Sequence, residues 1–170
     1  GERVARSVSG CLATGVCDRG CPQDAQLGMH VLTVPRAVEA GAIVYTRARA
    51  DKLLLSGSRA FGVQASLLGA DGVPTGRTLR IVCDRVVVAC GALATPALLL
   101  RSGITPPSGQ LGRNLHLQPA VRVLASFPGD VRALEEVPQT WEVAQLRADG
   151  ITIHGLPAPL ATLARTLPAV

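Results

Sequence analysis

The chain has 170 residues, of which 48% are hydrophobic and 17% charged, a globular composition that argues against disorder. Its formal net charge is +5, but 16 of its 17 basic residues are arginines, scattered singly, and aromatic residues make up only 2%. Because neither a basic stripe nor a set of stacking side chains is visible, we expect no nucleic-acid partner.

The longest uncharged run, residues 86–100, has 15 residues and contains both a glycine and a proline. A membrane-spanning helix needs about 20 apolar residues, so no span is predicted. The first ten residues lack the apolar segment of a signal peptide, and we expect a cytoplasmic location. The chain begins with Gly1 instead of a methionine, which suggests an internal piece of a longer protein.

Residues 11–30 have no helical or strand periodicity, and residues 1–30 are predicted to form a structured loop. This loop holds possible zinc ligands in Cys11, Cys17, Cys21 and His30, although the paired C-x2-C spacing of common zinc sites is absent. Two interpretations stay open for it. It is either a small zinc-binding or interaction module, or a loop with reduced thiols and no metal.

A short helix is predicted over residues 34–40, with Thr33 as its cap, Pro35 in its first turn and Gly41 beyond its end. The apolar, β-branched residues 42–46 then predict a strand covered on both faces. Three further strands, separated by glycine-containing turns, follow within residues 50–84. The economical arrangement for them is an antiparallel meander.

Residues 85–103 predict a strand, a tight turn and a helix. The apolar strand covers residues 85–90, Gly91 makes the turn, and Thr95 and Pro96 begin a helix that ends near Ser102. Such a unit presents backbone N–H groups at the carboxyl edge of an open α/β sheet. Gly91 can equally serve the bend alone, and no G-x-G-x-x-G turn occurs in the chain.

Beyond residue 105, turn residues alternate with short strand-like pieces at residues 120–127 and 150–155, and residues 158–167 have helical spacing. We expect a domain boundary near residue 117. Asn114 and His116 lie in a polar turn just before it, where they are either functional or an ordinary turn asparagine and an exposed imidazole. No G-x-S-x-G nucleophile motif occurs, so hydrolase chemistry has no support.

Three segments resemble one family, the glucose-methanol-choline (GMC) flavin oxidoreductases. GALATPALLLRSGI, residues 91–104, is similar to the second signature of the family, and GCPQDAQ and GQLGRNLHLQP are similar to two other family segments. Three positions depart from the family pattern. Thr105 replaces a glycine, Gln26 replaces a lysine, and Gln118 replaces a histidine.

The resemblance implies a mixed α/β fold with a partial FAD-binding domain over residues 1–117 and the start of a substrate-binding domain over residues 118–170. It also implies FAD as cofactor and an alcohol as substrate. The cofactor contacts it implies are Ala50, at the adenine edge, together with Gly91, Ala92, Asn114 and His116. The catalytic histidine pair of the family has no match here, so we expect this chain alone to be inactive.

Overall fold

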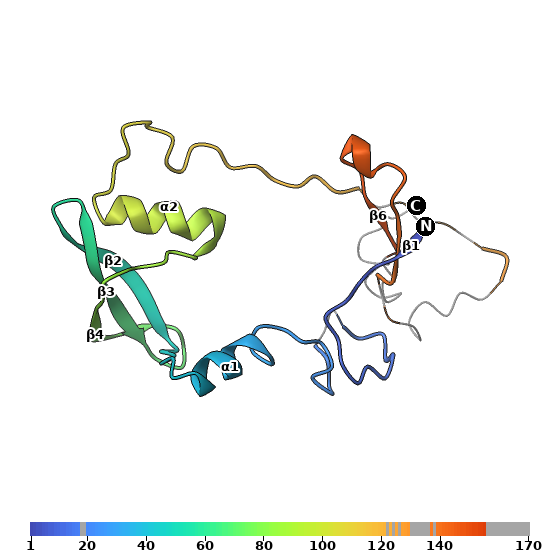
Figure 1. The fold of residues 1–170 in the computed structure, drawn as a ribbon, viewed down its shortest axis with the longest axis horizontal. Helices are drawn as coiled ribbons and strands as arrows, with labels where there is room; N and C mark the ends of the chain where they lie inside the picture. Colours follow the sequence, from blue (N-terminus) through green and yellow to red (C-terminus); the bar gives the residue numbers. More distant parts are fainter. Residues whose placement is uncertain are drawn as a thin grey trace. The chain divides into compact units, whose positions relative to one another are not determined.

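The computed structural model describes residues 1–17, 20–121, 123, 125, 127–129, 137 and 139–155. The chain divides into two compact units, residues 1–43 together with residues from 123 on, and residues 44–122. Figure 1 traces both units along the chain. The predicted boundary at residue 117 lies near the end of the second unit and stays a prediction. None of the described helices is long and apolar enough to cross a membrane.

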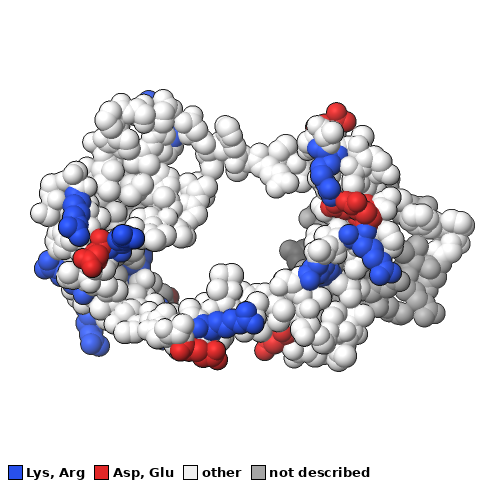
Figure 2. Space-filling view, in the orientation of Figure 1, with Lys and Arg blue, Asp and Glu red and all other residues white. Residues whose placement is uncertain are grey.

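The first unit is held by a small antiparallel sheet in the order β1-β5-β6, made of β1 (Glu2–Arg3), β5 (Trp141–Val143) and β6 (Ile153–His154). A short 3-10 helix, η1 (Arg147–Asp149), lies between β5 and β6. Arg147 forms ion pairs with both Glu2 and Glu142, and it therefore ties η1 to β1 and β5. Acidic and basic side chains are accordingly interspersed in this unit on the face drawn in Figure 2.

Helix α1 (Thr33–Glu39) confirms the helix predicted over residues 34–40. It ends as expected, because Gly41 has a φ of +94° and its N–H donates to the carbonyl of Val38. Thr33 lies inside the helix and does not cap it, which corrects the predicted start by one residue.

The second unit contains the predicted meander, β2 (Ala48–Ser56), β3 (Arg59–Leu68) and β4 (Pro74–Val82), paired in that order and antiparallel. Position 62 in β3 requires glycine, because a Cβ atom there would lie 2.3 Å from the carbonyl oxygen of Ile81 in β4. Helix α2 (Gly91–Arg101) packs against β2. The buried hydrophobic residues of this unit, Leu53, Ala65 and Leu98, come from these elements and form its core.

Two predicted strands are wrong. Residues 42–46 and 85–90 form no strand. Residues 42–46 are exposed, with Ile43 at 77%, and in residues 85–90 Val87 is 88% exposed while Val86 and Val88 are half-buried. The two sheets and two helices confirm the expected mixed α/β fold. The strand pairs among the described residues are all antiparallel, so no parallel pairing occurs within that part of the chain. A strand is stable only beside a partner strand, and neither segment has one within the described residues.

The prediction for α2 is right in kind and wrong at the start. The helix begins at Gly91, four residues before the expected cap, so Pro96 lies inside it. The additional first turn is fastened by Thr95, whose Oγ1 accepts a hydrogen bond of 3.1 Å from the N–H of Cys90. The C-terminus is as predicted, because Gly103 has a φ of +76° and the N–H of Ile104 reaches back to the carbonyl of Leu99.

The C-terminal predictions are tested only in part. Of the expected strand over residues 150–155, β6 confirms the two residues Ile153 and His154. Of the segment 120–127, residues 122, 124 and 126 lie outside the described residues, and the described ones form no strand. The helical segment 158–167 falls entirely outside the described residues.

Candidate functional site

The N-terminal end of α2 is open and carries no competing charge. The side chain of the N-cap residue Cys90 makes no capping hydrogen bond, and no acidic residue lies in the first turn. Gly91 has a φ of +80°, and a Cβ atom built on it would meet no heavy atom within 4 Å. The first N–H groups of a helix have no partner within the helix and carry a partial positive charge. They are therefore available to a negatively charged group placed beside Gly91 and Ala92.

A groove of about 580 Å3 runs along one face of α2. Its walls are the helix residues Ala92, Leu93, Pro96, Ala97 and Leu100 and the following segment, of which Pro106, Gln110, Leu111, Gly112, Asn114, Leu115 and His116 line it. Its size and its mostly apolar lining are those of small-molecule sites in proteins.

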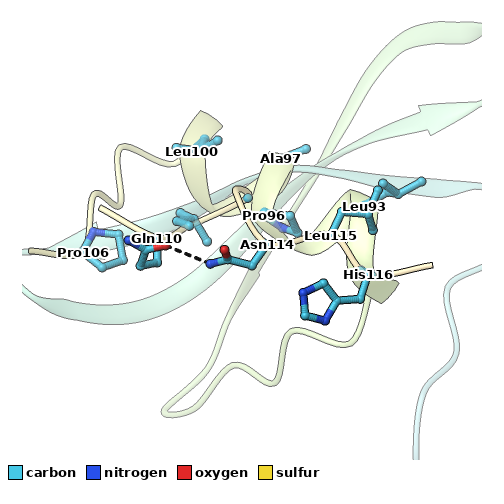
Figure 3. Close-up of a pocket in the computed structure, with 12 residues that line it drawn as sticks. Leu93, Pro96, Ala97, Leu100, Pro106, Gln110, Asn114, Leu115 and His116 are labelled. Atoms are coloured by element: carbon cyan, nitrogen blue, oxygen red, sulfur yellow. Dashed lines mark hydrogen bonds between the residues drawn. The ribbon is translucent and has the colours of Figure 1, made fainter. Parts of the chain in front are cut away.

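The polar groups of the groove are few. Asn114 Nδ2 donates a hydrogen bond of 2.9 Å to Gln110 Oε1. Figure 3 shows this pair toward the Leu100 and Pro106 end, while His116 lies toward the Leu93 end. Since Asn114 keeps its own carbonyl oxygen free of this bond and His116 has two ring nitrogens, both can hydrogen-bond to a ligand in the groove.

The structure brings together some of the predicted site residues and separates others. Ala92, Asn114 and His116 line the groove, and Gly91 is the residue just before it. Ala50 is half-buried in β2, paired with Ala65 of β3, and it does not line the groove. The predicted contacts therefore occupy two places in one unit, the sheet and the start of α2.

Sequence reasoning missed the apolar wall of the groove. Leu93, Pro96, Ala97 and Leu100 follow the i, i+3, i+4, i+7 spacing of one helix face, and that spacing is readable in the sequence. It was hidden because the helix was expected to begin later, with Leu93 outside it. Gln110, the partner of Asn114, had no sequence signal, since the pairing depends on the path of the loop.

Asp51, next to Ala50, is the ionisable residue of β2 with a perturbed environment. Its carboxylate accepts a hydrogen bond of 2.5 Å from Ser66 Oγ and lies 3.3 Å from Arg49 Nε. The Ser66 hydroxyl first, and the Arg49 guanidinium next, lower the pKa of Asp51 from its ordinary value of 3.8. Asp51 is therefore a charged, fixed residue of the strand beside the predicted adenine contact.

The zinc interpretation is not supported. Among the described residues, no three His, Cys, Asp or Glu side chains gather in a way that could hold a metal ion, so Cys11, Cys17, Cys21 and His30 do not form a site. Backbone groups engage Cys21 instead. The N–H of Ala25 donates to its sulfur at 3.3 Å, and backbone N–H groups, that of Gln23 above all, lower the pKa of its thiol.

The comparisons with known proteins agree on one family. A family model described as GMC oxidoreductase matches residues 1–120. An uncharacterized GMC-type oxidoreductase of Mycobacterium tuberculosis is 38% identical over 92% of this chain, and a long-chain-alcohol oxidase of Arabidopsis thaliana is 30% identical over 76% of it. A 5-(hydroxymethyl)furfural oxidase of a Methylovorus species is 36% identical over 64%.

The aligned region covers 24% of the mycobacterial relative and 18% and 19% of the other two, so the chain spans a quarter or less of their length. No solved structure matches the chain significantly.

Proposed function

Because the chain belongs to the GMC oxidoreductase family, we propose that it supplies part of the FAD-binding domain of an alcohol oxidoreductase. The observation that carries the proposal is the open, uncapped start of α2 at Gly91, next to a groove of ligand size, within the residues that the family model matches. Anionic groups of nucleotides bind at such helix starts through backbone N–H groups.

The residues present fit the nucleotide part of FAD. The space beside Gly91, where a Cβ atom would meet nothing, leaves room for a ligand against the main chain. Gly91 and Ala92 would offer backbone N–H groups to the phosphates, and Ala50 would meet the adenine edge through its main chain. Asn114 and His116 would add side-chain hydrogen bonds from the groove. When bound, FAD supplies the acceptor for the hydride that leaves the alcohol carbon.

The substrate class follows from the relatives and is likewise proposed. Relatives of this chain are named long-chain-alcohol oxidases and a 5-(hydroxymethyl)furfural oxidase, and we infer an alcohol as the substrate here as well. No residue of this chain is assigned as the base that removes the hydroxyl proton. The 170-residue chain also has no G-x-G-x-x-G turn. We therefore expect it to bind FAD weakly and to show no turnover on its own.

The location is proposed from the cysteines. All five, Cys11, Cys17, Cys21, Cys83 and Cys90, are unpaired thiols. Unpaired thiols are usual in a reducing compartment, and on this ground we infer the cytoplasm.

Weak binding calls for a residue-resolved test, and NMR titration of the 15N-labelled chain with FAD provides one. We expect amide shifts that saturate at Ala50, Gly91 and Ala92 together. Riboflavin, which lacks the phosphates and the adenosine, should leave these three amides unmoved. Shifts with FAD that avoid the start of α2 would overturn the proposal, and so would tight stoichiometric flavin that survives substitution of Gly91.

Gly91→Val is the variant for this titration, and Gly57→Val is its matched control. Both glycines have positive φ and open space at the Cβ position, and Gly57 lies in the turn between β2 and β3. Both substitutions place a valine at a backbone position with positive φ, so both cause the same type of backbone strain. Only Gly91→Val should abolish the FAD response.

A further inference from the structure

The C-terminal end of α2 is fastened to β2 by two side chains. Ser102 Oγ accepts a hydrogen bond of 2.8 Å from the N–H of Leu53 and donates one of 2.7 Å to the carbonyl of Leu98. Arg101 Nε donates a hydrogen bond of 3.2 Å to the carbonyl of Asp51. The two bonds to β2, Leu53 to Ser102 and Arg101 to Asp51, join residues 49 and 50 positions apart in the sequence.

One attachment holds the extra residue of a bulge in β2, and the other holds the strand two residues further on. The pairing of β2 with β3 shifts register between Ala50 and Lys52, which leaves Asp51 as the extra residue of a bulge. Arg101 holds the carbonyl of Asp51, and Ser102 holds the N–H of Leu53, two residues further on. The carboxylate of Asp51 is itself held by Ser66 of β3. The bulge is thus fixed by α2 and by β3 together.

A strand edge explains why a hydroxyl is suited to this place. β2 is an edge strand of its sheet, so its outward N–H and C=O groups need partners from outside the sheet. A hydroxyl can accept from the strand and donate to the helix at the same time, whereas a methyl group can do neither. Ser102 therefore joins a strand and a helix through one oxygen atom.

From these contacts we infer that Ser102 and Arg101 are positioning residues for the cofactor. Ala50 directly precedes the bulge, and Gly91 and Ala92 begin the helix whose last turn is attached to it. An 11-residue helix transmits the position of its last turn to its first, so the two attachments set the separation of the adenine-edge contact from the phosphate contacts. This inference rests on the proposed function.

The test measures the attachment and the ligand separately. Hydrogen exchange of the Leu53 amide reports on the bond to Ser102. NMR titration with FAD reports on the proposed cofactor contacts at Ala50, Gly91 and Ala92. In Ser102→Ala we expect faster exchange at Leu53 and an FAD Kd raised about three- to tenfold, the effect of one lost hydrogen bond. Ser102→Thr, which keeps the hydroxyl, should restore both values. Arg101→Met, which keeps the apolar stem, should raise the Kd in the same direction.

Thr75→Ala is the matched control. Thr75 Oγ1 also donates one side-chain hydrogen bond within the meander, to the carbonyl of Leu67, but it lies on β4, away from α2. Its loss should lower stability without changing the FAD Kd.

The outcomes separate the two proposals. Unchanged Leu53 exchange in Ser102→Ala would overturn the attachment, and unchanged FAD Kd with accelerated exchange would overturn the positioning role. A wild-type chain with a protected Leu53 amide and no FAD response at Gly91 would overturn the proposed function, and the positioning role with it, while the attachment itself stood.

Discussion

The hydroxyl of Thr95 accepts a hydrogen bond of 3.1 Å from the backbone N–H of Cys90, across the turn that contains Gly91. The bond runs backward along the chain, from within the helix to the residue before it. The next residue, Pro96, has no N–H to donate to the carbonyl of Ala92 four residues earlier. The first turn of α2, where we propose the nucleotide to bind, thus depends on a side chain of its own second turn.

Removing this hydroxyl should loosen the first turn. We expect Thr95→Val, which preserves the shape of the side chain, to lower the free energy of unfolding by about 0.5–1.5 kcal/mol, the usual net value of one hydrogen bond. Urea denaturation followed by circular dichroism measures the change. Thr95→Ser keeps the hydroxyl and should lie close to the wild type. Equal losses in the two variants would show that the methyl group matters and the hydrogen bond does not.

Gly91 should tolerate side chains according to their backbone preference and not according to their size. Its φ of +80° is unfavourable for residues with a Cβ atom, while open space surrounds the Cβ position. We expect Gly91→Val to cost about 1–2 kcal/mol of stability and Gly91→Asn to cost less, because asparagine enters the left-handed region more readily. Denaturant midpoints of the two variants decide the matter. A larger cost for Asn than for Val would contradict this reasoning.

Leu98 is the residue through which α2 contributes to the core, with 3% of its surface exposed. Leu98→Ala should therefore lower the free energy of unfolding by about 2–4 kcal/mol, through lost burial and a cavity. Leu93 lies on the groove side of the same helix and is 71% exposed. Leu93→Ala should stay within about 0.5 kcal/mol of the wild type. Similar losses at both positions, measured by urea denaturation, would place α2 on the sheet by another face.

Protonation of Asp51 should contribute to the loss of stability at low pH. The pKa of its carboxyl is lowered in the folded state, chiefly by the Ser66 hydroxyl, so the unfolded chain binds a proton more readily. The stabilisation is then complete above the unfolded value of about 3.8 and is lost as the pH falls through the lower folded pKa. Denaturant midpoints between pH 6 and pH 2 should drop more steeply for the wild type than for Asp51→Asn.

Ser66→Ala provides the check on the cause. Without the hydroxyl donor, the Asp51 pKa should rise toward its ordinary value, as followed by NMR of the carboxyl carbon. Thr75→Ala, which removes a hydroxyl from β4, should leave the Asp51 titration where it was. A titration that ignores Ser66 would assign the lowered pKa to the arginines instead.

The sequence by itself determined those features that depend on neighbouring residues. The ends of α1 and α2 at Gly41 and Gly103, and the meander over residues 48–82, follow from backbone preferences of glycine, from turn residues and from the alternation of side chains. The family, too, was readable from motifs in the sequence, above all in residues 91–104.

Tertiary structure decided what depends on partners far away in the chain. Residues 42–46 and 85–90 have strand composition but form no strand, because strand formation requires a neighbour that composition does not supply. The hydrogen bond from the Cys90 N–H to the Thr95 hydroxyl at the start of α2, and the burial of Leu98 on the face that α2 turns to the sheet, are both features of the folded chain. The bond from Leu53 to Ser102 spans 49 residues, and no local pattern encodes such a separation.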